Sequence, residues 1–401
     1  MSERLALFTR SLKKTYPVAI RGEGPWLWDA DNHRYLDFSS SAVVNFIGHG
    51  DHDVERAIAS QVHSLEFVHS SQFVTDAAEA FAQEILDFTG PNFTGGAVFF
   101  TSGGSEAAES AMKLARQYQV EVGQPQRTQF LCRGQAYHGS TIGAMSLSDN
   151  RKRKEIYAPL LHEYPRVATP YCYRCPYGCN DCVNGYVAEV ESALAQHGDE
   201  TAAFFFEPIS GATIGAAVPP DGYLQRATEA CRAQGVLIVA DEVMTGFGRT
   251  GCNFAVDHWN VAPDILVVGK GIASGYLPLG AVIASRKVVD AIAAGSGALV
   301  HGFTYNAHPV ACAAGREVLH KTRMLVDQAF CEDPHRECPG TWLRNGLHQL
   351  RDITCVGDVR GKGLLWAVEF VADKQTKTPF NHDQQFAQRV AETAAGRGLL
   401  T

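Results

Sequence analysis

The sequence predicts an α/β protein with one large α/β domain and a small α+β domain built from both chain ends. In the middle of the chain, short β-branched or aromatic runs alternate with turns and helical patterns, which is typical of a mostly parallel sheet flanked by helices. The first sixty residues instead carry short strand patterns separated by polar turns, and the pattern changes again beyond about residue 305. We therefore expect residues 61–305 to form the large domain, and residues 1–60 and 306–401 to form the small one.

The composition narrows the classes of protein. The chain has 401 residues, is 45% hydrophobic and 19% charged, and carries a formal net charge of −8. It is too apolar for a disordered chain and long enough for two domains. A negative net charge without a long run of basic residues argues against nucleic-acid or anionic-membrane partners. No apolar stretch reaches the ~18 residues that a membrane span needs, and the charged N-terminus does not resemble a secretory signal, so we expect a cytoplasmic protein.

The elements follow in chain order. Residues 22–38 resemble a small antiparallel meander. Later runs predict strands of the central sheet: residues 97–100, 129–132, 203–206, 236–240, 265–268 and 279–284. Between them, apolar residues spaced by three and four predict helices such as 105–120. Towards the end we expect a helix after His308 and Pro309, a strand at 364–370 and a last helix at about 382–397.

Residues that follow the predicted strands are the candidate site residues, because ligands of open parallel sheets bind beyond the carboxyl ends of the strands. Residues 101–106, with the sequence TSGGSE, follow one strand and open a helix. Small residues allow a ligand to approach the backbone, and a helix N-terminus offers free N–H groups, so this turn can hold a phosphate. An ordinary tight turn would also explain these residues.

An aspartate and a lysine also follow apolar strands. Asp241 comes directly after residues 236–240, and Lys270 comes two residues after 265–268. Burying either charge is costly unless it is paired or used. Desolvation lowers the pKa of a lysine and frees its amine to form a Schiff base. A buried Asp–Lys ion pair is the simpler alternative, and the two positions alone do not exclude it.

These groups together match the needs of pyridoxal phosphate. Tyr137 lies five residues after the strand 129–132 and offers an aromatic face. The cofactor needs a phosphate site, a carboxylate at the pyridine nitrogen, a lysine at the aldehyde carbon and an aromatic residue against the ring. Each signal alone has an ordinary structural explanation, but their joint occurrence favours a pyridoxal-phosphate site.

Two longer segments carry a family resemblance. Residues 239–251 read VADEVMTGFGRTG, and residues 269–280 read GKGIASGYLPLG. They resemble the signature of class III aminotransferases, a family that includes ornithine, 4-aminobutyrate and ω-amino acid transaminases. The resemblance extends from residues 22–24 near the start to 360–364 near the end. It implies the pyridoxal-phosphate transferase fold type I, with a seven-stranded type of sheet, and transamination between an amino acid or ω-amino donor and pyruvate or 2-oxoglutarate by a ping-pong mechanism.

The resemblance also implies roles for the residues that contact the cofactor ring. Lys270 would bind the aldehyde carbon and act as general acid and base, and Asp241 would bind the pyridinium nitrogen. Val243 and Tyr137 would pack on opposite ring faces, and His138 is placed among the cofactor-binding residues.

Further roles concern the phosphate, the partner subunit and the substrate. Gly104 and Ser105, with help from Gly103, would hold the phosphate, although the family's usual Ser-Gly-Ser/Thr reads Gly-Gly-Ser here. Thr304 would reach the phosphate of the neighbouring subunit, which implies a homodimer. Glu207 would be an acid near the cofactor. Arg360 matches an arginine that binds the substrate α-carboxylate in part of the family. A structural role for Arg360 in a turn is an equally good explanation.

Other functions stay open at this stage. A decarboxylating transaminase, an aminomutase and a racemase share the fold and the Lys/Asp pair. A cofactor-free binding protein is the alternative from a different class. A nucleotide-binding protein is disfavoured, because the chain has no G-x-G-x-x-G after a strand and Gly271 follows Lys270 where a P-loop has Ser or Thr.

A cluster of cysteines and two departures from the family pattern complete the sequence analysis. Four cysteines form a C-x2-C-x3-C-x2-C motif at residues 172–182, which is either a zinc or regulatory disulfide site or an ordinary loop near the active-site entrance. We assign no metal from the sequence. Residues 331–340 contain two prolines where family members have a regular helix. The family usually continues beyond the residues at which this chain stops, so we expect a short or incomplete small domain.

Overall fold

The central feature of the molecule is a mixed sheet. The structure, a computed structural model, describes residues 6–178, 181–330 and 337–401. Within these residues, seven strands lie in the order β4-β10-β9-β8-β7-β5-β6. The strands are β4 (Ala97–Thr101), β5 (Gln129–Arg133), β6 (Arg166–Val167), β7 (Thr201–Phe206), β8 (Leu237–Asp241), β9 (Ile265–Val268) and β10 (Gly280–Ala284). Strand β10 pairs antiparallel with both neighbours, and the other pairs are parallel. The predicted α/β fold class is confirmed.

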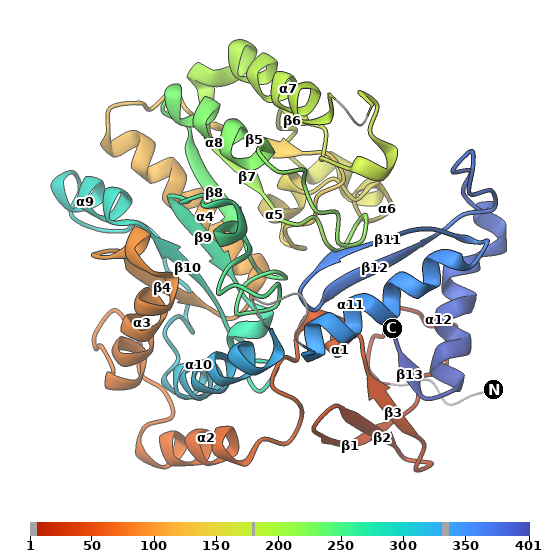
Figure 1. Cartoon of the computed structure of the whole chain (residues 1–401). Helices are drawn as coiled ribbons and strands as arrows, with labels where there is room; N and C mark the ends of the chain where they lie inside the picture. The colour runs from red at the N-terminus through yellow and green to blue at the C-terminus, as the bar shows by residue number, and fades with distance from the viewer. Residues whose placement is uncertain (1–5, 179–180, 331–336) are drawn as a thin grey trace.

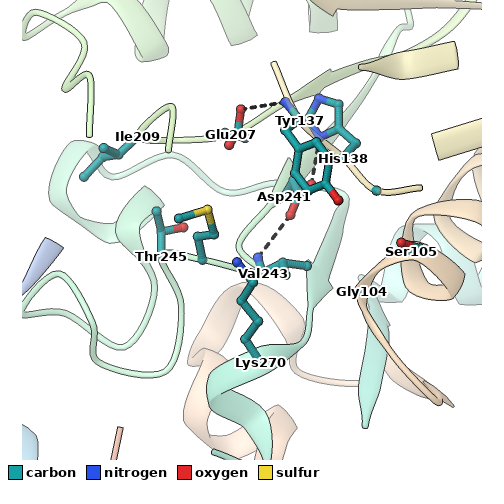
Figure 2. A pocket seen from close by; sticks show the side chains of 12 residues that line it. Gly104, Ser105, Tyr137, His138, Glu207, Ile209, Asp241, Val243, Thr245 and Lys270 are labelled. Carbon is teal, nitrogen blue, oxygen red and sulfur yellow. Dashed lines mark hydrogen bonds and ion pairs between the residues drawn. The ribbon is translucent and has the colours of Figure 1, made fainter. Parts of the chain in front are cut away.

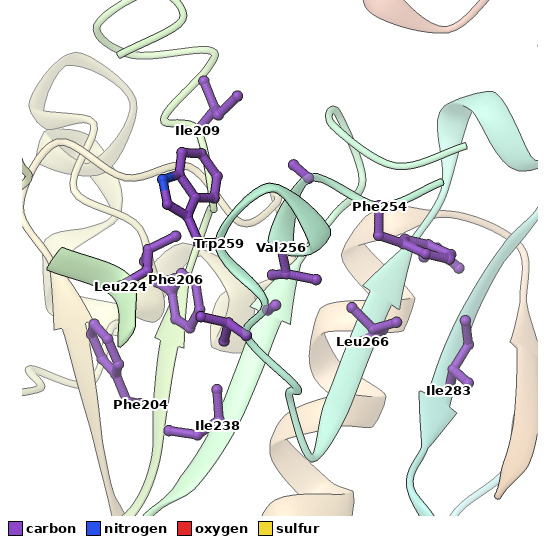
Figure 3. Close-up of a cluster of buried hydrophobic side chains, with 14 of the residues drawn as sticks. Phe204, Phe206, Ile209, Leu224, Ile238, Phe254, Val256, Trp259, Leu266 and Ile283 are labelled. Atoms are coloured by element: carbon purple, nitrogen blue, oxygen red, sulfur yellow. The ribbon is translucent and has the colours of Figure 1, made fainter. Parts of the chain in front are cut away.

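Strands β7 to β10 are buried along their whole length. Alternate residues of a strand face opposite sides of the sheet, and here both sides are apolar. Phe204 and Phe206 join the core on one side (Figure 3), whereas Phe205 joins the core on the other side. Helix α4 (Gly104–Glu121) packs its small buried alanines into that second core. Burial on both faces leaves the strand ends as the places where polar residues can meet a ligand.

The two chain ends meet in a second sheet. Strands β1 (Ala19–Glu23), β2 (Trp26–Asp29) and β3 (Arg34–Asp37) form the predicted antiparallel meander. Strand β13 (Leu399–Leu400) pairs parallel with β3, so the first and last segments of the chain lie side by side (Figure 1). The exact domain boundaries stay predictions.

The C-terminal third differs from the prediction in one helix. Helix α10 (Pro309–Ala329) begins after His308 as predicted and packs on the N-terminal helices. The predicted helix at 382–397 is wrong at its start, because α12 (Phe386–Gly396) begins four residues later. A 3-10 turn (His382–Gln384) precedes it, and Gln385 has a left-handed φ of 43°, which an α-helix cannot contain.

The interrupted region follows α10. Helix α11 (Pro339–Gln349) starts with proline at its first position, where the missing N–H costs nothing. Of the predicted interruption, residues 331–336 lie outside the described residues. The hairpin β11 (Val356–Lys362) and β12 (Leu365–Phe370) follows, and β12 matches the strand predicted at 364–370.

The remaining helices cover the sheet and the chain ends. They are α1 (Ser40–Val43), α2 (His52–Ser64), α3 (Asp76–Thr89), α5 (Ile142–Leu147), α6 (Arg151–Lys154), α7 (Cys182–His197), α8 (Tyr223–Ala233) and α9 (Arg286–Ala294). Among the described residues, no helix combines the length and the apolar character that crossing a membrane requires.

Candidate active site

A cavity of about 150 Å³ lies at the carboxyl ends of the central strands. Figure 2 shows its lining side chains, which come from the loops after β5, β7, β8 and β9 and from the start of α4. The lining residues are Gly104, Ser105, Tyr137, His138, Gly139, Glu207, Ile209, Asp241, Val243, Met244, Thr245 and Lys270. Most of the residues that the sequence predicted for the site therefore meet in one place.

Asp241, the last residue of β8, is held from two sides. Its side chain is 5% exposed, and its Oδ2 lies 2.7 Å from Nδ1 of the fully buried His138. Its Oδ1 accepts a hydrogen bond from the backbone N–H of Val243 at 3.0 Å. These contacts give a buried carboxylate the hydrogen-bond partners that it needs. The carboxylate is thus held in a single orientation beside the cavity.

Glu207, directly after β7, is the second buried acid. Its Oε2 accepts from the N–H of Tyr137 at 3.2 Å, and its Oε1 accepts from the N–H of Gly211 at 3.1 Å. Burial raises the pKa of Glu207 above its ordinary value, and His138 opposes that shift. Because Glu207 binds backbone from two loops, it fixes the wall of the cavity as well as contributing a carboxyl group.

Lys270 enters the cavity from the turn after β9. Burial lowers the pKa of its ammonium group, although the charges of Asp241 and Glu207 raise it in part. Figure 2 shows the side chain extending toward Asp241 and Val243. Its backbone has a φ of 45°, a left-handed conformation that costs a non-glycine residue free energy and that clusters at functional sites. Lys270 therefore presents an amine that is easier to deprotonate than an exposed one.

The N-terminus of α4 forms one end of the cavity. A Cβ built on Gly104 would lie 3.0 Å from Cγ1 of Val243, so only glycine leaves the space between the backbone at 104 and Val243 free. The hydroxyl of Ser105 accepts from the N–H of Ser140 at 3.0 Å and lines the cavity. The first N–H groups of an 18-residue helix have no partner within the helix and favour an anion. Gly103 caps this helix but does not itself line the cavity.

Tyr137 is fixed by its neighbours on the loop after β5. Its hydroxyl lies 3.1 Å from Oγ of Ser140, and the guanidinium of Arg153 lies 4.9 Å from the centre of its ring. Tyr137 and Val243 both line the cavity. The ring is thereby available as one wall for a planar ligand.

Besides Gly103, two further predicted residues lie outside this cavity. Thr304 is exposed and contributes nothing to the lining within its own chain. Arg360 lines two other cavities, of about 370 and 780 Å³. Its Nη1 pairs with Glu369 at 2.8 Å and with Asp358 at 3.1 Å, and its Nε donates to the carbonyl of Gly215 at 2.6 Å.

Sequence reasoning missed four lining residues: Gly139, Ile209, Met244 and Thr245. Met244 and Thr245 stand inside the signature segment 239–251, three and four residues after Asp241, and could have been found there. Ile209 follows the acid after β7 by two residues, and no motif marks it.

Comparison with known proteins identifies the family. The sequence pattern described as aminotransferase class III matches residues 8–401. The chain belongs to the class III aminotransferases. One relative of this aminotransferase is the uncharacterized aminotransferase YodT of Bacillus subtilis, which is 38% identical over 397 residues, covering 98% of this chain and 88% of the relative.

Solved structures agree with this aminotransferase in fold. An (S)-enantioselective ω-transaminase from Thermomicrobium roseum superimposes with a TM-score of 0.91 at 35% identity, covering 99% of this chain and 88% of that one. An amine transaminase from an uncultivated Pseudomonas species, in its pyridoxal-phosphate-bound form, gives a TM-score of 0.91 at 34% identity, covering 100% and 90%. The fold is therefore the pyridoxal-phosphate fold type I, and the enzyme is a transaminase with pyridoxal phosphate as cofactor.

The cavity of this aminotransferase fits that cofactor. A buried, fixed carboxylate suits a protonated pyridine nitrogen, an amine of lowered pKa suits the aldehyde, and an open helix N-terminus at Gly104 suits the phosphate. The donors and the shape thus agree with the chemistry that the family requires.

Proposed function

We propose that the enzyme transfers the amino group of an amino acid or ω-amine to a 2-oxo acid, pyruvate or 2-oxoglutarate, in two successive half-reactions at the Lys270 cavity. The observation that carries this proposal is the buried amine of Lys270 placed opposite the fixed carboxylate of Asp241. The ω-transaminase activity named for the Thermomicrobium roseum structure supports an amine donor.

Lys270 is the proton carrier in this proposal. When bound, pyridoxal phosphate supplies an aldehyde that condenses with amines and a ring that accepts electrons. Lys270 holds the aldehyde carbon at rest. The donor amine would take the place of Lys270 at that carbon, and the freed Lys270 amine would then take the proton from the donor carbon; its lowered pKa makes it easier to deprotonate than an exposed lysine.

Asp241 and His138 act together in this proposal. Asp241 would bind the protonated ring nitrogen of the cofactor, and the backbone N–H of Val243 and the ring of His138 hold its carboxyl group in place. His138 contacts Asp241 with one ring nitrogen and is a positioning residue. Gly104 and Ser105 hold the phosphate through the helix N-terminus, with Gly103 contributing backbone, and Tyr137 and Val243 restrain the ring faces.

Arg360 recognises the α-carboxylate of the substrate in this proposal. Its guanidinium is balanced by Asp358 and Glu369, so a substrate carboxylate must take the place of one of these partners. In an Arg360→Ala variant, KM should rise for an α-amino acid donor and stay unchanged for an amine without a carboxylate. An equal rise for both donors would assign Arg360 to the fold alone.

The active unit in this proposal is a homodimer. The exposed Thr304 reaches the phosphate in the neighbouring subunit, which agrees with its absence from the cavity of its own chain. The cytoplasmic location stays a prediction from the sequence.

A Lys270→Ala variant tests the central role. We expect turnover to fall by at least about 10³-fold, because covalent anchoring and proton transfer are both lost. Lys287→Ala is a matched control, because it removes a lysine near the sheet that pairs with Asp264 at 3.0 Å, at a site away from the cavity. Steady-state rates and absorbance spectra of both variants measure the effect. Substantial activity in Lys270→Ala would refute the assignment.

A further inference from the structure

The cysteine motif at residues 172–182 does not line the cofactor cavity, and its role stays a prediction. The Sγ atoms of Cys172 and Cys182 lie 3.9 Å apart, and Cys179 lies outside the described residues. Contacts that bear on the chemistry of the cavity lie instead just beyond the turn that carries Lys270.

Ser274, four residues after Lys270, joins that turn to the N-terminal part of the chain. It is buried, with 3% of its surface exposed. Its hydroxyl oxygen accepts hydrogen bonds from the backbone N–H groups of Phe46 at 2.7 Å and Ile47 at 3.2 Å. The same hydroxyl donates to Oδ1 of Asn45 at 3.3 Å. One buried hydroxyl group therefore binds three consecutive residues from near the start of the chain.

The next two residues extend this contact. A Cβ built on Gly275 would lie 3.2 Å from Cγ1 of Val44, so the two segments pack closely there. The hydroxyl of Tyr276 accepts from the N–H of Asp51 at 2.7 Å and donates to the carbonyl of Gly48 at 2.9 Å. The segment after the lysine turn is thus bound to the N-terminal segment at three successive positions.

The contact of residues 274–276 with residues 44–51, which we call the N-terminal seam, lies beside a strained turn. Lys270 and Ser274 both have left-handed φ values, 45° and 48°. This conformation costs free energy in a residue that has a Cβ, and it persists only where surrounding contacts fix it. The hydrogen bonds of the Ser274 hydroxyl are contacts of that kind.

Backbone hydrogen bonds connect Ser274 with Lys270. Lys270 begins a 3-10 turn that ends at Ile272. The N–H of Ala273 donates to the carbonyl of Lys270 at 3.3 Å. The N–H of Ser274 donates to the carbonyl of Gly271 at 3.3 Å. Because the turn is short and bonded along its length, a displacement of Ser274 would displace the backbone of Lys270 and with it the amine.

The N-terminal seam also fixes a buried cation near the lysine. Arg249 is 6% exposed, and its Nη2 donates to the carbonyl of Asn45 at 2.9 Å. Burial is the main cause of the lowered pKa of Lys270. The charges of Asp241 and Glu207 oppose this shift, and the charge of Arg249 adds to it. The charge environment of the amine therefore depends on where the amine lies among these three groups.

We propose that Ser274 is a positioning residue for Lys270, which fastens the turn after β9 to residues 44–51 and so sets where the lysine amine lies in the cavity. Ser274 does not line the cavity, so it acts through the backbone of the lysine and not by contact with cofactor or substrate. This role rests on the proposed function, because it takes Lys270 as the group that moves the proton.

A Ser274→Ala variant tests this role, because it removes the acceptor of two backbone N–H groups. We expect kcat per cofactor-loaded site to fall at least about tenfold and KM for the amine donor to stay within about twofold, because a misplaced amine slows proton transfer more than binding. The pH midpoint of the cofactor absorbance should shift by at least about 0.5, because the amine moves relative to its charged neighbours.

Ser285→Ala is the matched control. Ser285 is 8% exposed, and its hydroxyl has no hydrogen-bond partner among the described residues. This variant should keep the kcat per loaded site and the pH midpoint of the wild type. A wild-type value of either quantity in Ser274→Ala would overturn the proposal, even if fewer sites carry cofactor. That result together with an inactive Lys270→Ala would leave the proposed function intact.

A second variant serves if Ser274→Ala fails to fold. Ser274→Gly removes the same hydroxyl, but glycine adopts a left-handed φ at little cost. It should lose kcat per loaded site as Ser274→Ala does. Wild-type kcat in Ser274→Gly would show that the hydroxyl does not position the lysine and would overturn the proposal.

Hydrogen exchange tests the N-terminal seam in the wild-type holoenzyme itself. The N–H groups of Phe46 and Ile47 should exchange at least about tenfold more slowly than exposed N–H groups, because both are hydrogen-bonded to Ser274. Their exchange should become faster in Ser274→Gly. Exchange in the wild type at the rate of exposed groups would overturn the proposal.

Discussion

At the scale of single residues, the burial of a side chain and its hydrogen-bond partners decide whether it can act as an acid, a base or a nucleophile. Asp241 and Lys270 were predictable, because each follows an apolar strand where an unpaired charge is costly. The contact between His138 and Asp241 was not predictable, because it joins residues 103 positions apart through the order of strands in the sheet. The left-handed φ of Lys270 was not predictable either, because Gly269 and Gly271 mark a turn there but do not show that the lysine itself takes the positive φ.

Glu242, adjacent to Asp241, makes the stability of the enzyme depend on pH. It is 1% exposed, and burial raises its pKa from 4.5 to about 7. Its folded-state pKa is above its unfolded value, so the native state holds a proton that the unfolded state has lost between these two values. Stability should therefore fall as pH rises from about 4.5 to about 7, by roughly 3 kcal/mol for this group.

Glu242→Gln should remove most of that dependence, because glutamine stays neutral. The melting temperature should fall less between about pH 5 and pH 8 in this variant than in the wild type. Glu191→Gln changes an exposed acid and should keep the wild-type behaviour. Identical pH dependence in Glu242→Gln and the wild type would contradict the role of Glu242.

At the scale of elements, strong apolar patterns were predictable and short or strained segments were not. The strand predicted at 265–268 is confirmed residue for residue as β9. Strand β6 has two residues, too few for a periodic pattern to be recognised. The left-handed Gln385 divides the last predicted helix, and no glycine or proline marked that break. The residues around α4 were predicted because small residues between a strand and a helix have a specific physical role.

Two adjacent glycines at the start of α4 give an internal comparison. Gly104→Ala places a Cβ 3.0 Å from Val243, whereas a Cβ on Gly103 meets nothing within 4 Å. Overpacking costs about 1–3 kcal/mol, so Gly104→Ala should weaken cofactor affinity by roughly 5–150-fold. Gly103→Ala keeps its N–H and should bind as the wild type does. Absorbance titration of the cofactor-free enzymes measures both affinities, and equal affinities would show that Val243 does not limit the approach.

At the scale of the whole molecule, one chain supplies most of the cavity. The family and the fold were predictable, because the two signature segments, residues 239–251 and 269–280, stand at the carboxyl ends of the adjacent parallel strands β8 and β9. The domain division stays a prediction; the structure shows that β13, near the end of the chain, pairs with β3 near its start. Contacts between subunits are harder to predict from the sequence, since they depend on the shapes of two folded surfaces and not on motifs within one chain.

Mixed dimers test the proposed role of Thr304. Thr304→Ala homodimers should lose roughly tenfold or more in cofactor affinity, because a hydrogen bond to a charged phosphate is lost. A dimer of one Thr304→Ala chain and one Lys270→Ala chain contains one site with Lys270 and the partner subunit's Thr304. That site should bind cofactor as tightly as a wild-type site and turn over. If the mixed dimer is no better than the Thr304→Ala homodimer, Thr304 does not act across the interface.

The most direct test of the account is a half-reaction of the holoenzyme with one amine and no acceptor. We predict one oxo product per active site, conversion of the cofactor from its aldehyde to its amine form, no release of CO2, and recovery of the aldehyde form when a 2-oxo acid is added. Lys270→Ala should show none of these changes on the time scale of the wild type. Product that forms only when both substrates are present, or CO2 in amounts equal to product, would contradict transamination at Lys270.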